Sequence, residues 1–339
     1  MAHPLDVTRE QVLAFRRRVG ALDERLPPGA ASLRQAAWAG LSDSMPRGAL
    51  LSIHARVAGA GPSAWEDPSL AQVWGPRFSA YVVPAMDVAV FTLGRMPPDG
   101  PRTRFGNATA DRLEAFLAGR TLPYSEAGRG LGVVPNSLRY AAPTGRVRIR
   151  WDGARQPTIW TVPPPAMDAA DARMELARRY LHVMGPGSVT GYGSWAGIKP
   201  QHASATFEAL GRSLVAVRTP IGDAWILAED EAELRGEARP AAPARLLPSG
   251  DVFYLLQGID RELLVPDADQ RARLWTSRVW PGALLLDGQV AGTWRRSDAV
   301  LTVEPWRQPS PEERDAVQAE AESLPLPGAA DRIQVRWAS

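Results

Sequence analysis

A short polar run near residue 40 holds the side chains best suited to chemistry in this sequence. Residues 40–51 read GLSDSMPRGALL and place Ser42, Asp43 and Ser44 between an apolar pair and a proline. A carboxylate between two hydroxyls can orient water, accept its proton or stabilise a positive charge. The run also suits a helix start, with Ser44 as N-cap and Pro46 in the first turn. A cap alone, a cap that also serves catalysis, and an unrelated binding role all stay open.

Other catalytic chemistries have little support in the sequence. The chain has no cysteine, and its four histidines show no metal-ligand spacing: His3, His54, His182 and His202. We therefore expect no metal and no cofactor. No apolar run approaches the roughly 18 residues that cross a membrane, and no basic-apolar leader opens the chain. A cytoplasmic, nucleoid-associated protein without membrane contact is the expectation.

The distribution of charge predicts an anionic partner. Residues 1–165 hold 20 arginines against 13 acidic residues, whereas residues 166–339 hold 19 basic and 24 acidic residues. All basic residues except Lys199 are arginine. A GC-rich genome would explain the preference for arginine, but it would not move acidic residues into one half. Nucleic acid is the commonest partner of such a basic region, and an uneven solvated surface is the alternative. Our expectation is double-stranded DNA.

A basic strand supplies the best candidates for contacts with phosphate. In residues 146–151 three apolar side chains alternate with arginines, which predicts a half-buried strand with one basic face. The predicted DNA-binding residues are Arg47, Arg77, Arg139, Arg146, Arg148 and Arg150. Arg47 adjoins the polar loop and a helix N-terminus, and Arg139 lies on a recognition-type helix. Their alternatives are a solvated wing and salt-bridged surface arginines.

A recurring order of elements predicts the architecture. Helical runs followed by a tight hairpin occur three times, and the order is clearest where helices at 110–120 and 135–142 precede a hairpin at 146–162. Helices at 168–184, 190–198 and 199–211 then precede a hairpin at 213–229, and the first copy holds helices at 8–22, 31–41 and 46–57. This is the plan of a winged helix.

After about residue 241 the pattern changes to short β-type runs with turns at Ser249-Gly250, Asp287-Gly288 and Ser297-Asp298, and one helix at 310–324. We therefore predict an α+β chain of three tandem winged-helix units, residues 1–98, 99–165 and 166–232, followed by a small C-terminal β-rich domain, residues 241–339. Because several winged helices in one chain remove the need for a dimer, we expect a monomer.

Three segments make the chain resemble the winged-helix family that contains the AlkZ-type (YcaQ-like) DNA glycosylases: GALLSIHARV, LLPSGDVFYLLQGIDRELLVP and LLLDGQVAGTWRR. The resemblance implies a monofunctional DNA glycosylase that hydrolyses the N-glycosidic bond of N7-alkylated purines or unhooks crosslinks, in repair or self-resistance. It also implies a catalytic loop that reads Gln-Φ-Gln or Gln-Φ-Asp, where Φ is an apolar residue. This loop comes just before the helix that residues 46–51, PRGALL, match in this sequence. In this sequence Ser42, Asp43 and Ser44 occupy those three positions, so both glutamines are absent.

The chemistry of depurination defines what this loop has to do. An N7-alkylated purine is already cationic and leaves as a neutral base, so the protein need only position water and stabilise an oxocarbenium-like sugar. Asp43 would act as base or charge stabiliser, and Ser42 or Ser44 would hold the water. In an extended loop, however, Asp43 faces away from whatever the two serines face. A non-catalytic lesion sensor or regulator is therefore the second hypothesis, and a small-molecule-binding protein the third.

Aromatic and charged residues elsewhere have structural interpretations. Tyr81 and Trp74 flank the first hairpin and would line a lesion pocket or, more simply, the core. Trp195 is expected in the core. In the C-terminal signature, Asp251 and Asp260 are expected to hold their own domain together.

Overall fold

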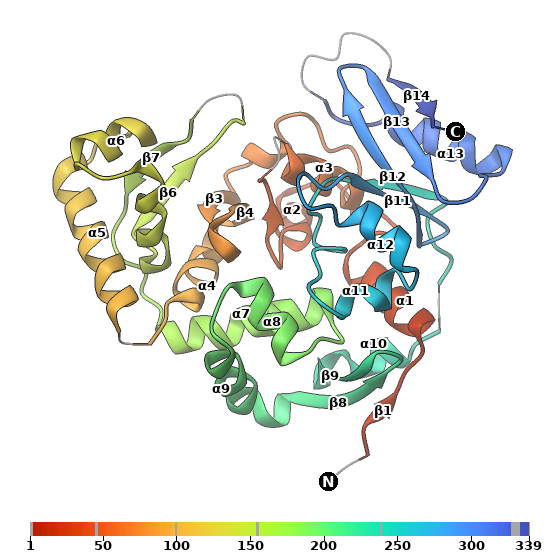
Figure 1. Cartoon of the computed structure of the whole chain (residues 1–339), viewed down its shortest axis with the longest axis horizontal. Coiled ribbons are helices and arrows are strands. Elements are labelled where there is room, and N and C mark those ends of the chain that lie inside the picture. Colours follow the sequence, from red (N-terminus) through yellow and green to blue (C-terminus); the bar gives the residue numbers. More distant parts are fainter. Residues whose placement is uncertain are drawn as a thin grey trace.

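The protein is a mixed α+β molecule with four small sheets surrounded by helices (Figure 1). The structure is a computed structural model that describes residues 3–44, 47–98, 100–153, 156–237, 239–326 and 333–338. No helix within these ranges is long and apolar enough to cross a bilayer.

The first sheet forms beside three helices. Its strands are β2 (Leu41–Ser42), β4 (Ala80–Pro84) and β3 (Leu70–Trp74), in that antiparallel order, and the helices are α1 (Arg9–Val19), α2 (Ala30–Ala36) and α3 (Gly48–Arg56). A capping box between Thr8 and Gln11 begins α1. The helix predicted at 31–41 ends at Ala36, because Leu41 and Ser42 pair with Val82 and Tyr81 instead.

The second sheet belongs to a lobe at one side of the molecule (Figure 1). The elements of this lobe are α5 (Pro101–Leu117), β5 (Leu122–Pro123), α6 (Tyr124–Gly130), η5 (Pro135–Thr144), β6 (Val147–Arg150) and β7 (Thr158–Thr161). The α-helix predicted at 135–142 is a 3₁₀ helix, since Pro143 within it has no amide hydrogen to donate. The predicted hairpin forms, with Ile149 opposite Ile159 over the core of the lobe.

The third sheet takes a strand from the N-terminus. Three helices precede its hairpin, namely α7 (Ala169–Met184), α8 (Val189–Ala196) and α9 (Pro200–Leu210), and the hairpin strands are β8 (Leu214–Thr219) and β9 (Gly222–Leu227). The side chain of Asp168 caps α7 by accepting from the amides of Ala170 and Asp171. Strand β1 (Leu5–Asp6) joins β8 in parallel, a pairing that no local pattern predicts.

The fourth sheet has five strands in sequence order, β10 (Ala244–Leu247), β11 (Gly282–Leu286), β12 (Gln289–Ser297), β13 (Val300–Pro305) and β14 (Gln334–Trp337), with α13 (Pro311–Glu322) packed on it. The expected turn at Asp287-Gly288 forms with both residues at positive φ. The β-type run predicted after Ser249 is wrong: this segment is a loop followed by α11 (Asp260–Leu264) and α12 (Ala268–Leu274). The Asp267 carboxylate caps α12, and the Asp251 carboxylate accepts from the Phe253 amide, so both favour turns over strands.

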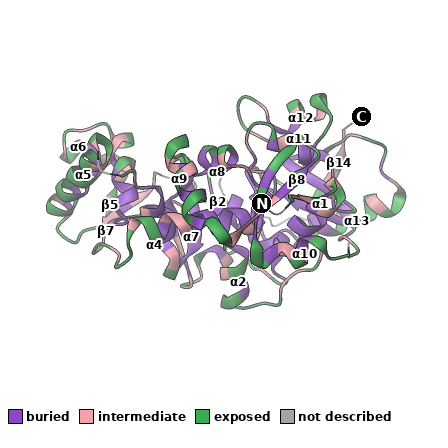
Figure 2. Ribbon diagram, turned by 90° about the horizontal axis from the view of Figure 1, so that it is seen from below, coloured by how far each residue is buried: buried purple, intermediate pink, exposed green. Residues whose placement is uncertain are grey.

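The largest apolar core crosses the boundaries expected from the sequence. Leu50 of α3, Tyr180 of α7 and Trp195 of α8 share it with Tyr254 and Trp275. These last two belong to the segment between β10 and β11, residues 248–281, which we call the C-terminal loop. Buried residues therefore run continuously through the middle of the molecule, while exposed ones cover the outer faces of α5 and α9 (Figure 2). The packing joins three of the four predicted segments in one core. The division of the chain into four domains stays a prediction.

Candidate functional site

The polar loop is extended, and its side chains alternate between two sides. Ser42 pairs with Tyr81 of β4, and the amide of Asp43 donates to the carbonyl of Ala80 at 2.8 Å. The hydroxyls of Ser42 and Ser44 lie on the same side, with their oxygens 3.4 Å apart. Asp43 points the other way and is only 1% exposed. The loop thus presents hydroxyls on one side and a carboxylate on the other.

Ser42 and Ser44 line a cavity of about 380 Å³. Its other polar and aromatic walls come from the first sheet, from α8 and from the C-terminal loop: Arg77, Ser79, Tyr81, Trp195, Ser249, Ser277, Arg278 and Trp280. Segments far apart in the sequence meet here because glycines allow close approach. A Cβ on Gly48 would lie 3.0 Å from the carbonyl oxygen of Ser42, and one on Gly250, at φ +75°, would lie 3.3 Å from the Ser42 hydroxyl.

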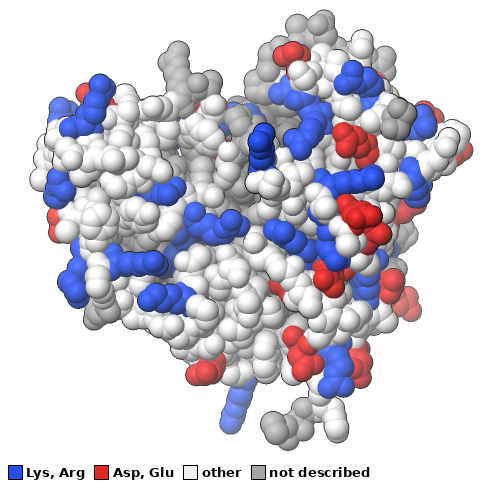
Figure 3. All heavy atoms as spheres, in the orientation of Figure 1, with Lys and Arg blue, Asp and Glu red and all other residues white. Residues whose placement is uncertain are grey.

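The cavity is electropositive. Arg77 and Arg278 form no ion pair within the described part of the chain, and no carboxylate is among the described residues of the cavity wall. Arg77 and the next residue, Phe78, both have left-handed backbone angles, φ +55° and +59°, which is strained for side chains of this size. Lys and Arg side chains form a band across the middle of the same face as Figure 1, and acidic ones gather toward one side (Figure 3). Such a wall suits a ligand that carries phosphate.

Asp43 caps helix α3 and holds the loop in place. Its Oδ1 accepts from the Ala49 amide at 3.1 Å, its Oδ2 accepts from Gln72 Nε2 at 2.7 Å, and Arg47 Nη1 lies 3.8 Å from Oδ2. Burial raises the pKa of Asp43 to about 6, although these three partners each oppose the rise. The N-cap position is thus Arg47, not Ser44 as predicted, and the side-chain acceptor for the first turn of the helix is Asp43. Met45 and Pro46 lie outside the described residues.

Two contacts fix this loop to the neighbouring lobe. Gln72 of β3 donates to the carbonyl of Trp151 and accepts from its amide at 2.6 Å, so one side chain joins Asp43 to the end of β6. The guanidinium carbons of Arg47 and Arg150 lie 3.9 Å and 4.2 Å from the centre of the Trp65 ring. Two cation–π contacts with one indole hold the first sheet against the lobe.

The arginines predicted to contact phosphate differ in the partners that they already have within the protein. Arg146 forms ion pairs with Asp111 and Glu114 of α5, and Arg150 pairs with Glu66 at 2.9 Å. Arg148 donates to the carbonyl of Gly145. Arg139 lies 5.8 Å from the ring of Phe78, and Arg47 is engaged by Asp43 and by the carbonyl of Asp152. Of the six, Arg77 is the one in the cavity wall. A phosphate at Arg146 or Arg150 would compete with protein carboxylates, and the role of all six arginines in DNA binding stays a prediction.

The far end of α3 is anchored in a second polar network. Arg56 binds both oxygens of Asp251 at 2.7 Å, and Ser52 donates to the same carboxylate at 2.6 Å. Asp251 was expected to serve its own domain, but it joins α3 to the loop that carries Ser249 and Gly250. The cavity wall and the helix are therefore held together at this point.

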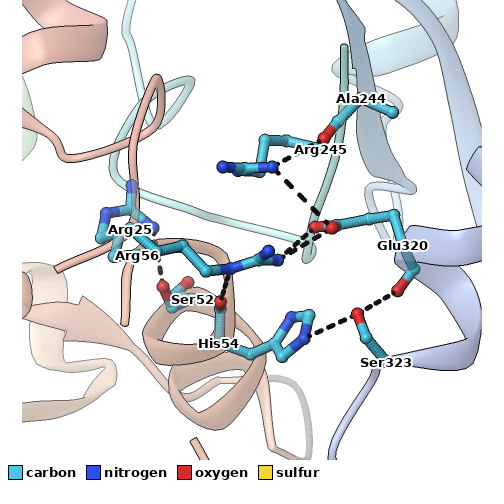
Figure 4. Close-up of polar contacts among 8 residues, drawn as sticks. All are labelled: Arg25, Ser52, His54, Arg56, Ala244, Arg245, Glu320 and Ser323. Atoms are coloured by element: carbon cyan, nitrogen blue, oxygen red, sulfur yellow. Dashed lines mark hydrogen bonds and ion pairs between the residues drawn. The ribbon is translucent and has the colours of Figure 1, made fainter. Parts of the chain in front are cut away.

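A neighbouring cluster ties α3 to α13 (Figure 4). Glu320 binds Arg25 at 2.8 Å and lies 3.9 Å from Arg245, while Arg25 donates to the carbonyl of His54. His54 Nε2 lies 3.1 Å from the hydroxyl of Ser323, and burial lowers the pKa of His54 to about 4. The histidine is a neutral structural residue.

Several site residues were not singled out by the sequence. Gln72, Ser249, Arg278 and Trp280 reach the loop or the cavity only through long-range packing. Tyr81 was considered for a lesion pocket and lines this cavity, whereas Trp74 is not among its described wall residues. Trp195 is in the core, as expected, and also forms part of the wall. Within the sequence, the run LLPSGD (residues 246–251) was the one local pattern that pointed to a C-terminal segment in the cavity wall.

Comparison with known proteins adds a family and a fold. The family model described as "AlkZ-like: DNA glycosylase AlkZ-like" matches residues 35–325. Among solved structures, a DNA glycosylase AlkZ from Streptomyces sahachiroi superposes with a TM-score of 0.79 at 18% identity, covering 98% of this chain and 100% of that one. At this identity the likeness shows a shared fold. No curated protein matches the chain.

Proposed function

Because this chain belongs to the AlkZ-like DNA glycosylase family, we propose that it hydrolyses the N-glycosidic bond of cationic, N7-alkylated purines in double-stranded DNA. The observation that carries the proposal is the pair of hydroxyls, Ser42 and Ser44, in the wall of a cavity that also holds two arginines without carboxylate partners. We further propose that the three helix-and-hairpin segments are winged helices and that the chain acts as a monomer.

The cavity supplies what a cationic leaving group requires. The base departs neutral, so no general acid is needed. The two serine oxygens, 3.4 Å apart, accept and donate hydrogen bonds and would hold one water against the sugar. Asp43 acts as a positioning residue, since it fixes the loop to α3 without reaching the cavity.

The same wall would bind an extruded nucleotide. Tyr81, Trp195 and Trp280 offer aromatic surface to a flipped base. Burial raises the pKa of Tyr81, so its phenol stays protonated and can donate a hydrogen bond. Arg77 and Arg278 would hold the flanking phosphates.

The test is release of base from a duplex that contains one 7-methyl-2′-deoxyguanosine, read as strand breaks at abasic sites after alkali. We expect excision by the wild type and a loss of about 100-fold or more in the Ser42→Ala/Ser44→Ala variant, because the water loses both partners. Ser63→Ala, an exposed serine outside the cavity, is the control. Wild-type activity in the double variant would exclude these hydroxyls from the reaction.

A non-catalytic DNA-binding function is the second candidate, and one observation favours it. The described wall contains no glutamine to orient the water and no carboxylate or histidine to take its proton. Salt-dependent binding to the lesion duplex without any base release would establish this alternative and exclude the enzyme.

A further inference from the structure

A second cavity, outside the candidate catalytic site, has the walls of a nucleotide site. It measures about 630 Å³ and is lined by Phe78, Arg95, Pro101, Arg102, Phe105 and Tyr140, among others. Phe78 and Tyr140 meet edge to face at 5.1 Å, and Phe105 lies 6.1 Å from Tyr140. Phe105 and Tyr140 are 52% and 43% exposed, which is unusual for rings that contact each other.

Among the residues that the structure describes, the two arginines in this cavity wall have no counter-ion. Arg95 is 4% exposed, and its Nε and Nη1 donate to the carbonyls of Ala196 and Trp74. Nη2 has no hydrogen-bond partner among the described residues, no carboxylate pairs with this arginine there, and its guanidinium carbon lies 4.6 Å from the centre of the Phe78 ring. Burial lowers the pKa of Arg95 to about 10, so it remains a cation at neutral pH. Arg102, at the exposed side of the cavity, is likewise without an ion pair in the described chain.

A buried cation without a counter-ion is costly, and it becomes favourable when an anion binds. We propose that this cavity binds one nucleotide unit, with the base on the rings of Phe105 and Tyr140 and the phosphate on Arg95 and Arg102. Base–aromatic stacking and a guanidinium–phosphate pair are the two interactions that the walls offer. The inference does not require glycosylase activity.

The position of the cavity connects it to the candidate catalytic site. The strained turn at residues 76–78 sends Arg77 to the wall of one cavity and Phe78 to the wall of the other. A nucleotide of a bound strand and a free mononucleotide share the same chemistry, and both would fit.

Calorimetry with 2′-deoxyguanosine 5′-monophosphate and with an undamaged single-stranded hexanucleotide tests the site. We expect Phe105→Ala and Arg102→Gln each to weaken binding of at least one probe by about tenfold, since each removes one of the two interactions. Arg104→Gln, an exposed arginine of the same helix outside the cavity wall, should bind like the wild type.

The two probes distinguish the source of the nucleotide. Dependence on Phe105 and Arg102 for the mononucleotide identifies a free-nucleotide site, and dependence for the hexanucleotide alone identifies a strand nucleotide. Equal binding of both probes by Phe105→Ala, Arg102→Gln and Arg104→Gln, or no binding of either probe to the wild type, overturns the proposal. Because no lesion is present, failure of base excision leaves this result unaffected.

Discussion

The two ends of helix α3 hold two buried carboxylates that differ in how closely a cation approaches them. At the C-terminal end, Asp251 receives both guanidinium nitrogens of Arg56 at 2.7 Å. At the N-terminal end, Asp43 has its nearest cation, Arg47, at 3.8 Å, and burial raises its pKa to about 6. Both side chains are 1% exposed. Equal burial therefore gives different chemistry, depending on whether a cation is in direct contact.

The two carboxylates therefore have different effects on the segments around them. A carboxylate that accepts two charge-assisted hydrogen bonds from one arginine fixes two segments to each other. A carboxylate held mainly by amides takes up a proton near pH 6 and makes its surroundings sensitive to pH. The candidate catalytic loop, residues 42–44, lies at the N-terminal end of α3, where the carboxylate with the raised pKa is.

The largest expected effect comes from breaking the matched end. Asp251→Asn leaves the Arg56 guanidinium buried without its anion, so we expect a loss of about 3–5 kcal/mol in the free energy of unfolding, measured with urea. The double variant Arg56→Met/Asp251→Leu removes both charges and should recover most of that loss. A single variant as stable as the wild type would contradict the comparison.

The dependence of the free energy of unfolding on pH should reveal the raised pKa of Asp43. The pKa of Asp43 is raised from 3.8 to about 6, so folding binds its proton and stability falls as pH rises through this range. The pKa of His54 is lowered from 6.5 to about 4, so stability rises with pH over nearly the same range. In the wild type the two contributions largely offset each other.

Asp43→Asn removes one side of this balance. We expect stability to rise between pH 4 and 6 by up to about 1.4 kcal/mol per pH unit in this variant. His54→Gln should give a slope of the opposite sign. Urea titrations at half-unit intervals measure both, and parallel curves for the wild type and both variants would show that neither pKa is shifted.

The ion cluster on α13 should contribute less. Glu320→Gln removes the anion shared by Arg25 and Arg245, one of which is in part exposed, so we expect a loss of about 1–3 kcal/mol. Thermal unfolding measures it, with Glu312→Gln, whose side chain lies at the exposed start of the same helix, as the control. A larger loss than in Asp251→Asn would reverse the ranking of the two networks.

The smallest effect on stability is expected in the cavity itself. Ser42→Ala/Ser44→Ala removes one long hydrogen bond of 3.4 Å and should change the free energy of unfolding by less than about 0.5–1 kcal/mol. Together with lost base excision, an unchanged urea midpoint would place these hydroxyls in function. Marked destabilisation would instead make them structural.

Local sequence determined much of the secondary structure. Amphipathic periodicity and the Asp168 cap define α7, and the Asp287-Gly288 turn defines the hairpin of β11 and β12, because both signals act over a few residues. The alternation of Ser42, Asp43 and Ser44 also followed from the period of an extended chain. The 3₁₀ form of η5 and the turns after Ser249 were missed, because proline and side-chain capping outweighed the apolar pattern there.

Only the tertiary structure decided which residues meet. No local pattern places Gln72 beside Asp43, Arg278 in the same cavity wall as Ser42, or Asp251 beside Arg56, since each pair comes from segments that are distant in the chain. Burial is likewise a property of the packed molecule. Desolvation of Asp43, which gives the loop its titration near pH 6, and the exclusion of that carboxylate from the cavity both arise from how α3, β3 and the C-terminal loop pack together.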